Sequence, residues 1–215
     1  MKSELRRRDF NRLAVGLSAL GLSGLAWSND KARHILVVGD SLSAEYGIAR
    51  GTGWVALLSQ QLANHKPPWQ VVNASVSGDT TAGGLARLPA LLKQYSPNVV
   101  VIELGGNDAL RGFPLKTTEK NLTQMVAACH QAKATVLLIG MQVPPNYGQA
   151  YAQDFSRMFA RISQQQRTQL VPFLLKGVAD ATDPTALFQP DRIHPKAEAH
   201  PIILSNVWPV LKRML

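Results

Sequence analysis

Ser41 is the first residue in the chain whose type and position suit covalent chemistry. Residues 35–38 (ILVV) are wholly apolar and mostly β-branched, which is typical of a strand buried on both faces. Gly39 and Asp40 end this run, and Ser41 follows directly. Open α/β sheets bind ligands at the carboxyl ends of their strands. Ser41 is therefore a candidate nucleophile, with a loop serine that caps the next segment as the alternative.

A serine nucleophile needs a general base, and His194 is the histidine best placed to be one. It lies in a proline-bounded loop after the last predicted strand. Asp191, three residues earlier, can accept its Nδ1 proton and orient the ring. A helix-capping pair remains the alternative for these two residues. The other histidines are placed less well. His34 starts a predicted strand at the opposite edge of the sheet, His65 and His130 lie at or near helix ends, and His200 lies within the last helix.

Acyl transfer also needs donors that stabilise the developing oxyanion. The backbone N–H of Ser41, the backbone N–H of Gly78 and the side-chain amide of Asn107 are the candidates. Gly78 follows the second predicted strand, and Asn107 follows the third. Since parallel strands all end at one edge, these groups are expected to converge there. A simple turn at Gly78 and a self-bonded loop asparagine at Asn107 are the alternatives.

The sequence contains no metal-binding pattern. There is no H-E-x-x-H motif and no paired-cysteine motif, and one histidine among scattered carboxylates does not define a metal site. Nor does a G-x-G-x-x-G turn follow the first predicted strand, which argues against a nucleotide site. We therefore expect no metal and no cofactor.

Strand and helix patterns alternate along the chain, and these elements would position the candidate residues. Strands are predicted at residues 35–38, 70–73, 99–104, 135–140 and 170–173, with amphipathic helices between them. We expect the third helix to begin near Thr117, and Pro209 to kink the last helix or end its regular part. The pattern predicts an α/β fold with a parallel sheet of about five strands and helices on both faces.

The first 28 residues predict an export signal. A cluster of arginines precedes an apolar stretch that ends in Ala26-Trp27-Ser28, which is the layout of a secretory signal. Residues 7–10 also resemble a twin-arginine signal, and a Sec signal is the alternative. Cleavage would leave residues 29–215 as one domain, in the periplasm or secreted.

The remaining composition favours a mildly basic exported protein. The chain carries a formal net charge of +9, and residues 29–215 carry +6 of it without a basic run. A nucleic-acid binder would cluster such charges. Cys129 is the only cysteine, so neither an internal disulfide nor a lipid anchor is expected, and we predict that it is a core residue. We expect a monomer with no nucleic-acid partner and no stable membrane anchor.

Four segments together resemble the GDSL/SGNH hydrolase family. They are residues 39–43 (GDSLS), 77–79 (SGD), 105–108 (GGND) and 191–195 (DRIHP), and they occur in the order of the family's motif blocks. The likeness extends to residues 71–80, 84–94, 101–113 and 144–148, and is greatest to the family's bacterial periplasmic thioesterases, lysophospholipases and arylesterases.

This resemblance implies a flavodoxin-like three-layer α/β/α sandwich. It also implies Ser41 as nucleophile, His194 as base, Asp191 as its orienting group, and Ser41, Gly78 and Asn107 as the oxyanion hole. The implied substrates are acyl esters, acyl thioesters and lysophospholipids. The chain departs from the family at Glu45 and Arg192, where relatives commonly have glycine.

Apolar or amphipathic residues in the loops after the third and fourth predicted strands are candidates for binding the acyl chain: Leu110, Phe113, Pro144, Pro145 and Tyr147. The alternative is that they only pack these loops onto the sheet. Two other functions remain open: a carbohydrate acetylesterase of the same family, and a non-catalytic flavodoxin-like protein that binds a small ligand.

Overall fold

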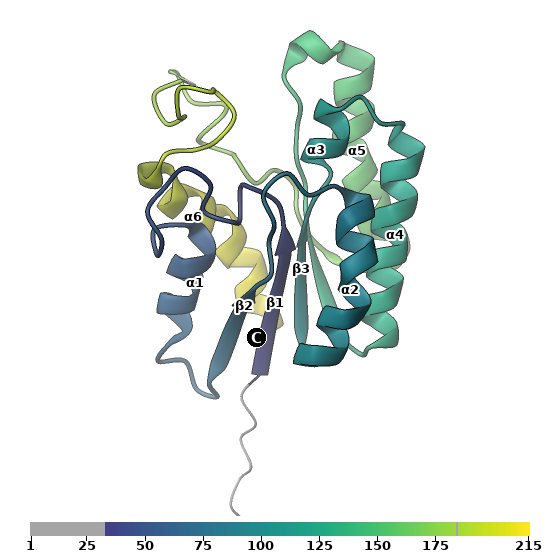
Figure 1. Ribbon diagram of the computed structural model, residues 1–215, viewed down its shortest axis with the longest axis vertical. Coiled ribbons are helices and arrows are strands. Elements are labelled where there is room, and N and C mark those ends of the chain that lie inside the picture. Colours follow the sequence, from purple (N-terminus) through teal and green to yellow (C-terminus); the bar gives the residue numbers. More distant parts are fainter. Residues whose placement is uncertain (1–32, 184) are drawn as a thin grey trace, which may run out of the picture.

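The computed structural model describes residues 33–183 and 185–215. Its centre is a parallel sheet of five strands in the order β2-β1-β3-β4-β5 (Figure 1). The strands are β1 (Arg33–Gly39), β2 (Trp69–Asn73), β3 (Val99–Glu103), β4 (Thr135–Ile139) and β5 (Gln169–Val171). The predicted parallel α/β fold is confirmed, whereas the predicted export signal lies outside the described residues.

Strand β1 is central because its side chains are apolar on both faces. The residues from Ile35 to Val38 are fully buried, and the strand pairs with β2 on one side and β3 on the other. Its last residue, Gly39, lies opposite Glu103, the last residue of β3. Continuous apolar strands of this kind occur where helices cover both faces of a sheet.

Helices cover both faces of the sheet (Figure 1). Helices α1 and α6 pack together on one face, and α2, α4 and α5 form the layer on the other. The buried residues of both layers and of the sheet, Cys129 among them, form one hydrophobic cluster. The bounds are α1 (Trp54–Leu62), α2 (Thr81–Tyr95), α3 (Gly106–Leu110), α4 (Leu115–Gln131), α5 (Gln149–Gln166) and α6 (His200–Leu211), with 3₁₀ turns η1 (Pro145–Tyr147), η2 (Ala197–Ala199) and η3 (Lys212–Met214).

Three helix details differ from the sequence-based expectations. Helix α3 was not predicted, because five residues are too few to reveal a helical period. Helix α4 begins at Leu115 rather than Thr117, since the fixed φ of Pro114 suits a helix start. Helix α6 continues past Pro209 to Leu211: its buried face packs against α1, and that burial outweighs one lost backbone hydrogen bond. Within residues 33–183 and 185–215, no helix is both long and apolar enough to cross a bilayer.

Gly140 sets how closely β4 approaches the chain after β5. Its N–H donates to the Val171 carbonyl at 2.8 Å, and its own carbonyl accepts from Leu174 at 3.0 Å. A Cβ at this position would lie 2.3 Å from the Pro172 carbonyl oxygen. Because the obstacle is backbone rather than a flexible side chain, the two segments would have to separate.

We therefore expect Gly140→Ala to lower the free energy of unfolding by about 2–3 kcal/mol through overpacking. Chemical denaturation of the purified protein measures this. The matched control is Gly106→Ala, whose added methyl would lie 3.7 Å from the nearest atom, an Asp40 carboxylate oxygen, and should change stability little. Equal stability of the two variants would contradict this account of Gly140.

Candidate active site

The candidate residues gather where the strand order reverses. Strand β1 lies between β2 and β3. After β1 the chain adds β2 on one side of it, and after β2 it crosses back to add β3 on the other side. Ser41 follows β1, Gly78 lies between β2 and α2, and Asn107 lies in α3 directly after β3. Crevices at such switch points are the usual ligand sites of open α/β sheets.

Ser41, His194 and Asp191 form a continuous hydrogen-bonded chain. Nε2 of His194 lies 2.9 Å from Oγ of Ser41, although the two residues are 153 positions apart. Nδ1 of the same ring lies 2.7 Å from Oδ2 of Asp191. When Nδ1 carries the proton, Nε2 is free to accept the Ser41 proton, which is the arrangement of a nucleophile, its base and an orienting carboxylate.

Asp191 is held in its ionised form by its own loop. Its Oδ1 accepts the backbone N–H groups of His194 and Ile193 at 3.0 and 2.9 Å. These bonds, with that to the His194 ring, lower the pKa of the Asp191 carboxyl to about 2. The carboxylate therefore keeps its charge across the whole neutral and mildly acidic range. The Asp191 carboxylate thus stabilises the turn of its own loop with one oxygen and orients the His194 imidazole with the other.

Asn107 is oriented by Asp40. The Asn107 amide donates to Oδ2 of Asp40 at 3.0 Å, and the other oxygen, Oδ1, accepts from the Leu42 N–H at 3.0 Å. An asparagine amide has two N–H donors, so one remains for a ligand next to Ser41. Burial is the main cause that raises the pKa of Asp40 to about 6, against the lowering effect of these hydrogen bonds.

Gly78 lies at a turn that also suits an oxyanion donor. Its φ is +78°, a left-handed conformation that glycine adopts without steric cost. The Gly78 carbonyl accepts from Nη2 of Arg111 at 2.9 Å, which ties the loop after β2 to the loop after α3. Among the described residues, no hydrogen bond occupies the backbone N–H of either Gly78 or Ser41. Both predicted backbone donors are thus available to bind a ligand.

Tyr46 was missed by the sequence analysis. Its ring lies over the His194 imidazole, with 4.3 Å between ring centroids and a 39° tilt. A hydrogen bond holds the loop that carries Tyr46: the Gln189 side-chain amide donates to the Tyr46 carbonyl at 2.9 Å. No periodicity marks such a residue, because the contact joins two segments far apart in the chain. Only an aromatic residue a few positions after the nucleophile was visible in the sequence.

The two departures from the family pattern share one backbone conformation. Glu45 and Arg192 both have φ of +59°, in the left-handed region that favours glycine. The Glu45 carboxylate accepts the N–H groups of Gly51 and Gly53 at 2.9 and 2.8 Å. It thereby closes the loop between Ser41 and α1 and offsets part of the backbone strain.

The predicted acyl-binding residues lie above the same edge of the sheet. No described hydrogen bond or aromatic contact connects the residues near α3 with those of the loop after β4. Leu110 and Phe113 are 44% and 39% exposed near the end of α3, and Tyr147 is 36% exposed in η1. Pro144 is also exposed, whereas the side chain of Pro145 lies outside the described part of the chain. Figure 1 shows α3 and the green segment that leads into α5 rising above the sheet together.

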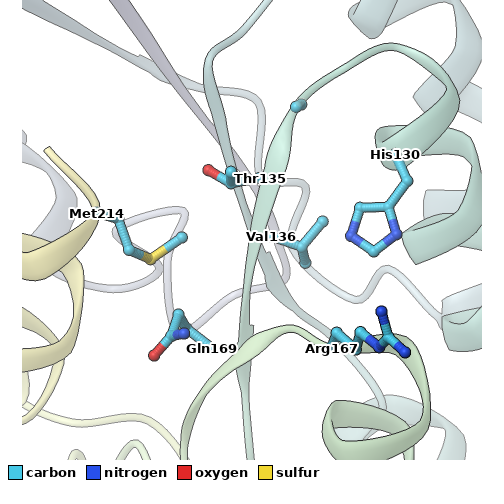
Figure 2. A pocket seen from close by; sticks show the side chains of 7 residues that line it. His130, Thr135, Val136, Arg167, Gln169 and Met214 are labelled. Atoms are coloured by element: carbon cyan, nitrogen blue, oxygen red, sulfur yellow. The ribbon is translucent and has the colours of Figure 1, made fainter.

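One surface hollow lies away from these residues. It has a volume of 210 Å³ and lies at the starts of β4 and β5, the edge opposite Ser41. His130 and Arg167 line it on one side of β4, and Gln169 and Met214 on the other (Figure 2). It contains none of the predicted site residues. In the described part of the chain, no group of three or more histidine, cysteine or acidic side chains is arranged to hold a metal ion.

We expect Tyr46→Phe to keep kcat within about twofold and Tyr46→Ala to lower it about three- to tenfold, because an aromatic contact contributes about 0.5–1.5 kcal/mol to holding a ring. Steady-state turnover of an ester substrate measures the difference. If Tyr46→Phe loses as much as Tyr46→Ala, the hydroxyl rather than the ring contact is what matters, and the packing argument is wrong.

Comparison with known proteins agrees with this geometry. The profile of the GDSL-like Lipase/Acylhydrolase family matches residues 37–202. Esterase TesA of Pseudomonas aeruginosa is 48% identical over 93% of this chain and 100% of its own length. An arylesterase of Vibrio mimicus is 42% identical over 85% and 90%, and thioesterase 1/protease 1/lysophospholipase L1 of Escherichia coli is 43% identical over 80% of each chain.

Solved structures show the same fold. The crystal structure of TesA superposes with a TM-score of 0.81 at 50% identity, covering 85% of this chain and 100% of TesA. The esterase EstA of Pseudoalteromonas, inhibited by monoethylphosphonate, superposes with a TM-score of 0.78 at 40% identity, covering 84% and 97%. By its sequence and its fold, this chain belongs to the GDSL-like lipase/acylhydrolase family.

Proposed function

We propose that this chain is a serine hydrolase that cleaves acyl esters and thioesters through an acyl-enzyme on Ser41. The observation that carries the proposal is the unbroken hydrogen-bonded chain from Ser41 through His194 to Asp191. Membership of the acylhydrolase family supports it. So do the names of the relatives, which include an esterase, an arylesterase and a thioesterase/lysophospholipase.

In the acylation step, Oγ of Ser41 attacks the acyl carbonyl carbon while Nε2 of His194 takes the hydroxyl proton. The carbonyl oxygen becomes an oxyanion, for which the Ser41 N–H, the Gly78 N–H and the Asn107 amide are the proposed donors. The intermediate then expels the alcohol or thiol, which receives the proton from Nε2. The acyl group remains bonded to Ser41.

In the deacylation step, water takes the place of the serine hydroxyl. Nε2 of His194 takes a proton from the water as its oxygen attacks the acyl carbon. As the intermediate collapses, the bond to Oγ of Ser41 breaks and Nε2 donates that proton to Oγ. The products are a carboxylic acid and free enzyme. Every proton transfer uses a side chain of this protein, so the proposed reaction needs no cofactor.

We assign the acyl chain to apolar residues of the loops that follow β3 and β4. Leu110 and Phe113 belong to α3 and its following loop, and Tyr147 with Pro144 and Pro145 belongs to the loop after β4. Large apolar side chains left exposed near a nucleophile favour an acyl chain over a sugar. We further propose a monomeric domain at residues 29–215, acting on acyl esters, acyl thioesters or lysophospholipids after export to the periplasm or medium.

Loss of the nucleophile or of the base should abolish turnover. We expect Ser41→Ala and His194→Ala each to lower kcat by about 10⁴-fold, because the members of such a triad act as a unit. Release of p-nitrophenol from a short-chain ester measures this, and the wild type should show a burst of one equivalent per Ser41 if deacylation is the slower step.

The matched control is Ser205→Ala, on the exposed face of α6, which should keep wild-type kcat. Asp191, with its pKa lowered to about 2, should stay ionised over the neutral and mildly acidic range, so its own titration should not change kcat/KM there. Turnover by Ser41→Ala at the wild-type rate would overturn the proposed mechanism.

The acyl-chain assignment predicts a dependence on chain length. Each methylene buried against Phe113 and Tyr147 should contribute up to about 0.8 kcal/mol, so kcat/KM should rise from acetyl to longer acyl esters until the groove is full. Phe113→Ala and Tyr147→Ala should weaken this rise, because each removes apolar contact area. The measurement is kcat/KM for a series of acetyl to palmitoyl esters and thioesters.

Tyr95→Ala is the control for this series, since Tyr95 ends α2 at the opposite edge of the sheet. A strict preference for acetyl groups, unchanged in both groove variants, would contradict the acyl groove and favour a carbohydrate acetylesterase. Binding of these esters without any turnover would instead favour a non-catalytic ligand-binding protein.

A further inference from the structure

A wholly buried carboxyl group, Glu103, lies directly behind the nucleophile loop. Glu103 is the last residue of β3 and is 0% exposed, and Asp40 beside it is 3% exposed. Gly39 makes room for Glu103 and for its partner Ser43: a Cβ at position 39 would lie 2.8 Å from Oε2 of Glu103 and 2.8 Å from the Ser43 hydroxyl. The glycine before Asp40 therefore serves the packing of a buried acid.

The surroundings of Glu103 do not compensate a negative charge. Its Oε2 accepts the Ser43 hydroxyl at 2.7 Å and the Asp40 N–H at 3.3 Å, and Oε1 has no hydrogen-bond donor among the described residues. No ion pair of the described chain includes Glu103 or Asp40. Burying an ionised carboxylate without a cation costs so much free energy that such groups take up a proton instead.

Asp40 is the better placed of the two acids to hold a charge. Each of its oxygens accepts an N–H group, one from Leu42 and one from Asn107. The charges of His194 and Asp79 also act on Asp40, with opposite signs. Burial, the Asp40 charge and the nearness of the Asp40 side chain each favour a proton on Glu103. Oε1 of Glu103 is the oxygen available to carry it.

We propose that Glu103 is a positioning residue that acts in its protonated form: its O–H donates to the Asp40 carboxylate, which in turn orients the Asn107 amide. The catalytic consequence rests on the role proposed above for Asn107. Electrostatics agree with the geometry, since burial first and then the Asp40 charge raise the pKa of Glu103 well above its usual value. The indole of Trp54 donates to the Ser43 oxygen at 3.2 Å, which leaves the Ser43 proton for Oε2.

Two substitutions separate a neutral donor from a charged group. Glu103→Gln keeps the shape and an N–H donor but cannot ionise, whereas Glu103→Leu keeps the approximate size without a donor. We expect Glu103→Gln to keep kcat within about threefold. Glu103→Leu should lower kcat about tenfold or more with a much smaller change in KM, because a hydrogen bond to a charged group is lost. Equal losses in both variants, or no loss in Glu103→Leu, would overturn the proposal.

The protonation state is tested without any turnover, in the inactive Ser41→Ala background. An infrared difference spectrum compares the Ser41→Ala protein with the Ser41→Ala, Glu103→Gln double variant, so that the two samples differ only in the side chain at this position. At pH 7 the single variant should show the C=O stretch of a protonated carboxylic acid, and the double variant should lack it. If that band is missing from the single variant, Glu103 is ionised and the proposal fails.

Unfolding as a function of pH gives a second readout. The native pKa of Glu103 is raised above its ordinary value of 4.5, so the native state binds the proton more tightly than the unfolded chain. Its contribution to stability is therefore full below pH 4.5 and is lost as the pH rises above that value. Glu103→Gln removes this pH dependence.

The denaturation midpoint of Glu103→Gln relative to wild type should therefore increase from about pH 5 to about pH 8. A constant difference over that range would contradict the proposal. Neither the infrared nor the unfolding measurement needs catalysis, so failure of the proposed hydrolase function would leave both results interpretable.

Discussion

The hydrogen bonds of the Asp40 carboxylate are the interaction on which the arrangement of the Ser41 and Asn107 loops depends. One oxygen fixes the turn that carries Ser41 through the Leu42 N–H, and the other holds the Asn107 amide. The loops after β1 and β3 are thereby fixed relative to each other. Because Gly39 lies opposite Glu103 in the sheet, the strand register itself delivers both loops to this carboxylate.

The polar residues of the site lie in loops that follow tightly packed apolar strands. Residues 35–38 and 99–102 are buried between the two helix layers, so the strand ends move little relative to one another. Above them, Arg111 connects the loops after β2 and α3, and Gln189 connects the His194 loop to Tyr46. Each loop thus has a hydrogen bond to a different loop, and the preorganisation that acyl transfer needs comes from contacts across the sheet edge.

The sequence predicted what depends on local pattern. Alternating strand and helix periods were enough for the parallel sheet, and strand ends were enough to bring Ser41, Gly78 and Asn107 to one edge. The sequence could not show that Tyr46 lies on His194, because nothing in either segment encodes a contact over so long a stretch of chain. The one acidic residue in the apolar run 99–104, Glu103, was a visible signal, but its meaning required the position of Asp40.

The left-handed backbone at Glu45 and Arg192 has a consequence for how the surroundings of Ser41 can diversify. In both places a turn fixes the main chain, and a side chain other than glycine costs about 1–2 kcal/mol. For Glu45 the carboxylate that bonds Gly51 and Gly53 offsets some of that cost. The Arg192 side chain is exposed and makes no hydrogen bond among the described residues, so the backbone at this position does not depend on it. A lineage, or an engineer, can therefore change the charge at position 192 with a modest effect on stability while the arrangement of Ser41, His194 and Asp191 stays unchanged.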